Sequence, residues 1–144
     1  MDQVIHNFLT TGKLSTLELG LRIESVLQLL PSVEFTREMT DGLKVYEHGD
    51  LQLATVDDEV FQFTLYFQDA IQIFPSELNI DRSAIPKTKR HFLKYLNEND
   101  LVCSPYLNLN GMQIGVRLKS GVFVTFDRQR LHSIGRTRLH EELF

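Results

Sequence analysis

Hydrophobic residues near the start of the chain recur at the spacing of an α-helix. The stripe covers residues 4–9, and Gly12 is a natural helix stop. A second helical stripe covers residues 23–30 and is closed by Pro31. A third helix is expected over residues 87–100, where the run KTKRHFLKYLNEND places aromatic and aliphatic residues on one side.

Between the second and third helices the hydrophobic period changes from about four residues to two. This alternation predicts strands at 43–45, 51–53 and 60–67. The short polar segments 48–50 and 57–59 separate them and are typical of tight turns. We therefore expect an antiparallel meander in this part of the chain.

A similar alternation follows the third helix. Asn110-Gly111 is a strong signal for a two-residue hairpin turn. The last segment, RTRLHEELF (136–144), is expected to form a short helix or a frayed end. The predicted strands of this part are 106–109, 112–118, 122–126 and 131–136.

The two meanders match each other at a shift of 71 residues, which superimposes 49–53 on 120–124. The same shift pairs Leu43 with Ile114, Val45 with Val116, Val60 with Leu131, and Phe63 with Ile134. After a two-residue adjustment, the helical residues Ile23, Val26 and Leu27 fall opposite Phe92, Tyr95 and Leu96. Any two hairpins alternate, so chance patterning is the other explanation.

These patterns predict an α+β fold in a single domain, 1–144. We expect an antiparallel sheet with helices packed on one face, built from two tandem α-β-meander pseudo-repeats, 1–72 and 73–144. One such unit has too little helix to cover its sheet, whereas two joined units complete a core. The other sheet face would stay open to solvent.

Composition agrees with one globular domain, since the chain has 144 residues of which 42% are hydrophobic. Charge is distributed unevenly. Residues 1–72 hold twelve acidic and four basic residues, a net charge of −8, and residues 73–144 hold seven acidic and eleven basic residues, a net charge of +4. Such a dipolar chain can steer a charged partner or favour self-association. The alternative is that the uneven charge reflects only two solvated faces of different composition.

The expected location is the cytoplasm, without a membrane association. The first twelve residues lack a basic start and a long apolar core, and no stretch approaches the roughly 18 apolar residues of a membrane span. Cys103 is the sole cysteine, so no disulfide can form within the chain. Its neighbours Val102 and Pro105 favour a core position at a strand end.

One segment resembles a known family. The SmpA/OmlA lipoproteins carry a short segment before their meander that resembles Leu17-Glu18-Leu19-Gly20, followed by Ile23, Val26 and Leu29-Leu30-Pro31. The predicted strands that follow, within residues 42–67, are similar to the strands of that family. Two such units in tandem resemble the β-lactamase inhibitory proteins, which grip a partner protein on a concave sheet. The resemblance covers 13–67 best. It implies a protein-binding scaffold, and it implies no functional residues because it lies in core positions.

No catalytic, metal or cofactor pattern stands out. The five histidines are scattered without ligand spacing, and neither a nucleophile signature nor a glycine-rich phosphate loop is present. We therefore expect a binding protein and not an enzyme, with no metal and no cofactor.

Two charged sets are the candidate contact residues. The acidic set could face a basic cleft of a partner; it comprises Glu47, Asp50, Asp57, Asp58 and Glu59. The basic set, in the last hairpins, comprises Arg117, Lys119, Arg128, Arg130, Arg136 and Arg138. A spacing of two would place Arg128 and Arg130 on one face of a strand. Acidic turns are commonly just solvated, which is the plain alternative.

The sequence thus favours an immunity or inhibitor protein that occludes a toxin or enzyme. The alternative is a regulatory protein that binds nucleic acid or a small ligand through the basic C-terminal half. Nucleic acid is the less favoured partner because the whole chain carries a net charge of −4 and shows no nucleic-acid-binding motif.

Charge reversal at Asp57, Asp58 and Glu59 is expected to slow association with the partner protein, because complementary charge raises association rates. Stopped-flow binding at low salt measures the rate. An unchanged association rate would exclude this acidic turn from the interface.

Overall fold

Eight antiparallel strands form one sheet, in the order β1-β2-β3-β4-β8-β7-β6-β5. The computed structural model describes residues 1–68 and 73–138. The strands are β1 (Glu34–Thr40), β2 (Leu43–His48), β3 (Leu51–Val56), β4 (Glu59–Tyr66), β5 (Cys103–Leu107), β6 (Gln113–Leu118), β7 (Val122–Asp127) and β8 (Arg130–Thr137). Each half of the chain is a meander, and the two meanders meet where β4 pairs with β8.

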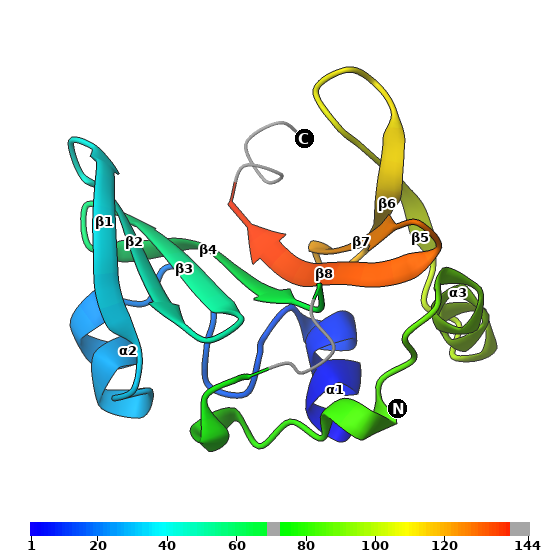
Figure 1. Cartoon of the computed structure of the whole chain (residues 1–144), viewed down its shortest axis with the longest axis horizontal. Coiled ribbons are helices and arrows are strands. Elements are labelled where there is room, and N and C mark those ends of the chain that lie inside the picture. The colour runs from blue at the N-terminus through cyan, green and yellow to red at the C-terminus, as the bar shows by residue number, and fades with distance from the viewer. Residues whose placement is uncertain (69–72, 139–144) are drawn as a thin grey trace.

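Three α-helices lie on one side of this curved sheet, and the other side is open (Figure 1). They are α1 (Gln3–Thr11), α2 (Ile23–Leu29) and α3 (Lys89–Glu98). Helix α1 begins at a capping residue, because the Asp2 carboxylate accepts a hydrogen bond from the Ile5 amide at 2.9 Å. Gly12, at a φ of 80°, ends α1 as predicted. The α+β prediction is confirmed.

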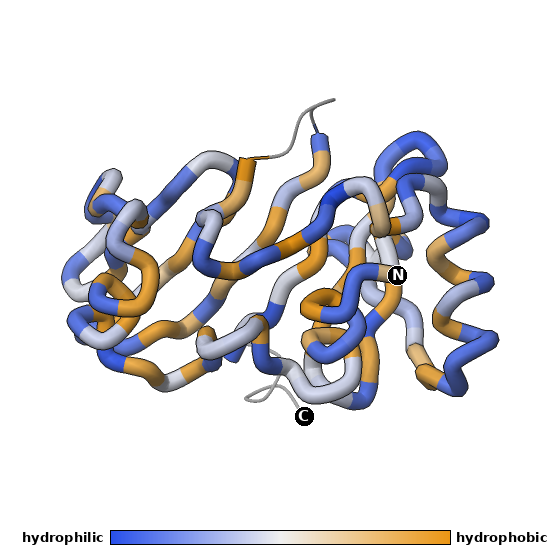
Figure 2. Tube along the Cα trace, turned by 90° about the horizontal axis from the view of Figure 1, so that it is seen from below, coloured by the Kyte–Doolittle hydropathy of each residue, from blue (hydrophilic) through white to orange (hydrophobic). Residues whose placement is uncertain are grey.

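Alternation along the strands separates the two faces of the sheet. In β3, Leu51 and Leu53 are buried against the helices, and Gln52 between them points to the open side. Hydrophobic and hydrophilic positions alternate in this way along much of the chain trace (Figure 2). The helix-facing side chains form one continuous core.

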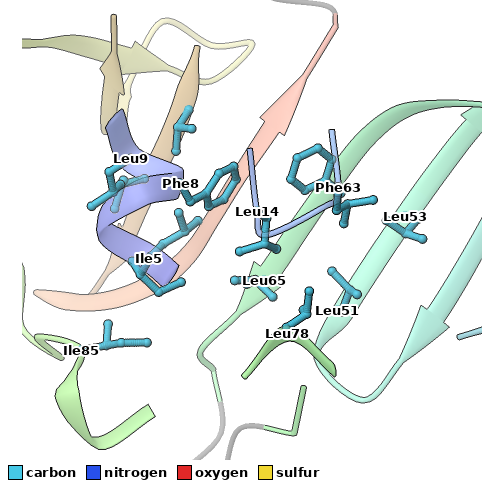
Figure 3. Packing of buried hydrophobic residues seen from close by; sticks show 14 of the residues in the cluster. Ile5, Phe8, Leu9, Leu14, Leu51, Leu53, Phe63, Leu65, Leu78 and Ile85 are labelled. Atoms are coloured by element: carbon cyan, nitrogen blue, oxygen red, sulfur yellow. The ribbon is translucent and has the colours of Figure 1, made fainter. Parts of the chain in front are cut away.

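Helix α1 lies beneath the middle of the sheet and fills its core. Phe8 of α1 stacks on Phe63 of β4, with ring centroids 5.4 Å apart, and both rings are fully buried. Ile5 and Leu9 extend this contact along the helix, and Leu14 follows in the next loop (Figure 3). The N-terminal helix therefore packs at the junction of the two meanders.

The register of the β4–β8 pair is symmetric about its centre. Thr64 pairs with Gly135 at its centre, flanked by Gln62 with Thr137 and by Tyr66 with Ser133. Gly135 has to be small: a Cβ there would lie 2.5 Å from Phe123 Cζ and 2.8 Å from Thr64 Oγ1.

The strand bounds on the two sides of the junction correspond. Adding 71 to the bounds of β3 and β4 (51–56 and 59–66) gives those of β7 and β8 (122–127 and 130–137). Both turns hold two residues at positive φ, Asp57-Asp58 and Arg128-Gln129. Both hairpins also carry a bulge at corresponding positions, next to Ala54 and next to Thr125.

An isolated β-bridge connects the start of α2 to the first hairpin, and a corresponding β-bridge connects the start of α3 to the second. Arg22, just before α2, bridges to Glu59, and Thr88, just before α3, bridges to Arg130. This places Val26 of α2 in correspondence with Phe92 of α3 at a spacing of 66 residues, and both side chains are fully buried.

The pairing of Ile23 with Phe92 expected from sequence is therefore wrong by about one helical turn. The pairings of Leu43 with Ile114 and of Val45 with Val116 are each wrong by one residue, because the turn before β7 is one residue longer than the turn before β3.

The structure differs from the sequence-based expectations at five further places. Strand β1 was not predicted, and β5 starts earlier than expected, at Cys103. The Asn110-Gly111 hairpin has a five-residue loop, 108–112, in place of a two-residue turn. Cys103 is exposed and not in the core. Of the tail, Arg136 and Thr137 belong to β8, and residues 139–144 lie outside the described residues.

Replacing Phe8 by Ala should lower the free energy of unfolding by about 3–5 kcal/mol, because its ring is fully buried and stacks on Phe63 of β4 at the junction. Leu109→Ala is the matched control; this leucine is fully exposed, so a change within about 0.5 kcal/mol is expected. Urea unfolding measures both variants. Equal effects would show that α1 does not hold the junction.

Candidate functional site

The open face of the sheet carries a pocket of about 370 Å³, on the side away from the helices. Its walls come from both meanders, because β4 and β8 run side by side at its centre. The lining residues are Gln62, Thr64, Tyr66, Tyr106, Ile114, Phe123, Thr125, Phe126, Asp127, His132 and Ser133.

Aromatic rings form two sides of this pocket. Tyr106 of β5 stacks on Phe123 of β7, with centroids 5.3 Å apart and planes 12° apart. Tyr66 of β4 meets His132 of β8 edge to face at 6.0 Å. Gly135 lies opposite Phe123 in the neighbouring strand, and a Cβ there would lie 2.5 Å from Phe123 Cζ. Gly115 lies opposite Tyr106, and a Cβ there would collide with the Val124 carbonyl oxygen.

Hydroxyl groups form the floor. The side chains of Thr125 and Ser133 share a short hydrogen bond, and Thr125 Oγ1 also lies 3.2 Å from His132 Nδ1. His132 and Ser133 are adjacent in sequence, yet both reach the pocket because the β7–β8 bulge leaves His132 unpaired.

The third floor hydroxyl belongs to Thr64, which is 3% exposed. Its hydroxyl interacts with the Tyr66 side chain: a hydrogen bond with Thr64 lowers the pKa of Tyr66, although burial raises that pKa more.

A chain of polar contacts extends from the pocket towards β1. The Tyr66 hydroxyl donates to Gln52 Oε1 at 3.4 Å, and Gln52 Nε2 donates to Glu47 Oε1 at 3.3 Å. Arg37 of β1 donates to the same Glu47 oxygen at 3.1 Å. This chain fixes the rotamers of side chains that would otherwise be mobile on an open sheet.

The β5–β6 hairpin rises beside the open face (Figure 1), and its tip carries exposed apolar side chains. Leu107 is 54% exposed, Met112 is 65% exposed, and Leu109 is fully exposed. Asn108 shapes the loop, since its side-chain oxygen accepts from the amides of Asn110 and Met112 at 2.9 and 3.0 Å. Three exposed apolar side chains on one loop are typical of an interaction surface.

The acidic candidates are divided between the two ends of β3. Glu47 and Asp50 lie at one end, where Asp50 Oδ2 accepts from the Ile73 amide at 2.7 Å. Asp57, Asp58 and Glu59 lie at the other end, roughly 20 Å away for six residues at about 3.3 Å each.

The acidic turn is also partly neutralised. Asp58 lies 3.4 Å from Lys44, and its carboxylate raises the pKa of that lysine. Glu59 lies 3.9 Å from Arg138.

The basic candidates are divided as well. Arg117, Lys119 and Arg136 line a second pocket of about 520 Å³ that also includes Cys103. Arg128 and Arg130 lie at the β7–β8 turn. Arg128 is a turn residue at a φ of 52°, so the prediction that the two arginines share one face of a strand is wrong.

The described residues include no group of three or more His, Cys, Asp or Glu side chains arranged to hold a metal ion. Within residues 1–68 and 73–138, no helix has the length and apolar character needed to cross a membrane. The arrangement of the open face is suited to binding, with aromatic rings, hydroxyls and an exposed apolar loop.

Comparison with known proteins finds no match to a family model, to a curated protein or to a solved structure. The resemblance to the SmpA/OmlA lipoproteins and the β-lactamase inhibitory proteins therefore stays a prediction.

Sequence reasoning missed most of the pocket residues. Phe123 and Thr125 are buried like Val122 and Val124, so no alternation of hydrophobic and polar residues marks them as part of the open face. His132 could not have been placed there, because only the bulge turns it outward.

Burial raises the pKa of each tyrosine, Tyr46, Tyr66, Tyr95 and Tyr106. The unfolded chain then loses its phenolic protons first, so stability present below about pH 10 should fall as the pH rises further. Phenolate absorbance should titrate at higher pH in the folded protein than in urea, and Tyr66→Phe should reduce the stability loss. Identical titrations in both states would contradict this.

Proposed function

We propose that this chain is a protein-binding module of the immunity or inhibitor type, which occludes a toxin or enzyme with the open face of its sheet. The observation that carries the proposal is the combination of that open face with the apolar hairpin tip beside it. The mechanism would be steric, since a partner seated on the sheet would have its own functional surface covered.

The residue types on this face support protein binding. Tyrosine, phenylalanine and methionine are enriched in interface centres, where large rings bury much area at a small cost in conformational entropy. Tyr106, Phe123 and Tyr66 lie on strands and contact neighbouring side chains, so they need little reordering on binding.

We also propose that the two halves are tandem copies of one helix-plus-meander unit. The shared strand bounds, turns, bulges and helix bridges support it. Joining the copies through their last strands, β4 and β8, puts one outer hairpin at each end of the sheet. The two outer hairpins have diverged: Asp41-Gly42 turns the first, and the longer apolar loop at Leu109 turns the second.

Charge supports a steering role in partner encounter. The corresponding turns Asp57-Asp58 and Arg128-Gln129 carry opposite charges at matched positions, which makes the folded molecule dipolar. A partner with a basic cleft would be drawn to the acidic end, and a second copy could associate head to tail. Nucleic acid is less supported, because the basic residues do not form one continuous stripe.

The proposed setting is the cytoplasm, where a sole cysteine stays reduced.

Capture from a lysate of the native host tests the docking face. The wild-type protein and Leu29→Glu should capture the same partner, because Leu29 is an exposed leucine on α2, on the helix side of the sheet. Leu109→Glu should lose that partner, because it places a charge in the apolar tip. The captured protein is then assayed with and without wild-type module, and loss of its activity is expected.

The opposite pattern, with the partner retained by Leu109→Glu and lost by Leu29→Glu, would assign docking to the helix side and contradict the proposal. A steep fall of binding to a generic DNA duplex with added salt would support the nucleic-acid alternative.

A further inference from the structure

The loop at the end of the β5–β6 hairpin contains two neighbouring residues that can react with each other. We propose that Asn110 is a site of spontaneous deamidation, in which the backbone nitrogen of Gly111 attacks the Asn110 side chain, and that Asn108 sets the rate. The product carries a new carboxylate among the exposed apolar side chains of this loop.

Asn110 differs from the other asparagines in its neighbour. The chain has six asparagines, and Asn110 is the one that precedes a glycine. The others precede phenylalanine, isoleucine, glutamate, aspartate and leucine, whose side chains hinder the backbone nitrogen that would have to attack. Glycine has no side chain and the widest conformational freedom, so its nitrogen reaches the asparagine side chain most easily.

Both reacting groups lie at the surface. Asn110 and Gly111 are exposed, and a Cβ placed on Gly111 would meet no heavy atom within 4 Å. The adjacent side chains do not anchor the loop in the core, because Leu109 is fully exposed and Met112 is 65% exposed. A segment with so little buried surface opens locally at a small cost in free energy.

The reaction needs only water. The Gly111 nitrogen loses its proton to water and attacks Cγ of Asn110. A bond forms between these two atoms, the bond from Cγ to Nδ2 breaks, and Nδ2 takes up a proton and leaves as ammonia. Water then adds to either carbonyl of the succinimide ring, which opens to aspartate or isoaspartate. No atom is oxidised or reduced.

Asn108 opposes the first step. Its carbonyl oxygen accepts from the Gly111 amide at 3.0 Å, so the attacking nitrogen is engaged while the loop is closed. Its side-chain oxygen accepts from the amides of Asn110 and Met112 at 2.9 and 3.0 Å and holds the loop in this shape. The reaction therefore proceeds from the opened loop, and the Asn108 contacts determine how often the loop opens.

The turn of the other outer hairpin offers a comparison within the chain. Asp41-Gly42 connects β1 to β2, and an aspartate can close the same ring with loss of water. Here the Gly42 carbonyl oxygen accepts from the Asp57 amide at 3.0 Å, and a Cβ on Gly42 would lie 2.8 Å from Asp57 Oδ1. This turn is held against the β3–β4 turn, so isoaspartate should form at Asp41 more slowly than at Asn110.

Peptide mass spectrometry during incubation at mildly alkaline pH tests the site. Native wild-type protein should gain the mass of an amide-to-carboxylate change at Asn110, and the urea-unfolded chain should convert several-fold faster. Asn108→Ala should convert several-fold faster than wild type when native and at the same rate in urea.

Two variants are the matched controls. Asn108→Asp keeps an oxygen acceptor for both amides and should stay near the native wild-type rate. Asn110→Gln would need a larger ring and should show no conversion at this position. Native wild-type protein that stays unmodified while the unfolded chain converts completely would overturn the proposal. Equal native rates for wild type and Asn108→Ala would overturn the role of Asn108.

The consequence for docking rests on the proposed function. Asn110→Asp places the charge of the product beside Leu109 and should lose the partner that the wild type captures, whereas Asn110→Gln should retain it. A partner retained by Asn110→Asp would contradict this consequence, and the modification site would stand on the mass measurement alone. If Leu109→Glu keeps its partner, the docking face itself fails, whatever the rate at Asn110.

Discussion

The pairing of β4 with β8 is the interaction on which the rest of the structure depends. Within residues 1–68 and 73–138 it is the strand pair that joins the two meanders, and its register is centred on Thr64 and Gly135. The absence of a side chain at Gly135 lets Phe123 and Thr64 lie over the junction. Beneath it, Phe8 and Leu9 of α1 fill the core on the side of the helices. Loss of this pair would leave two sheets with uncovered apolar faces, each short of helix.

One continuous sheet with helices on one side leaves the other side for binding. Its pocket draws on both meanders, with Tyr66 from β4, His132 from β8 and Phe123 from β7. No single half could build it. The bulge beside Thr125 turns the His132 side chain outward, so this irregularity of the strand adds an imidazole to the pocket. The proposed inhibitor role follows from this joined surface.

The sequence predicts the elements whose burial follows a simple period. The alternation at Leu51 and Leu53 predicts β3, and the hydrophobic stripe at residues 4–9 predicts α1. Strand β1 was missed because all seven of its residues are exposed, so no alternation marks it. Charged residue types in and beside the predicted turns indicate the charged candidates, and the strand geometry places them at opposite ends of the strands. The pocket depends on which strands become neighbours, and no local pattern encodes that β4 lies beside β8.

Native-state hydrogen exchange tests the central role of the junction most directly. If the β4–β8 pair unites the two halves, amides that bond across it, near Thr64 and Gly135, should exchange only through global unfolding. The inner strands β3 and β7 should then show the same opening free energy. Exchange of the β4–β8 amides at a clearly lower free energy than β3 or β7, with each half opening separately, would contradict the account.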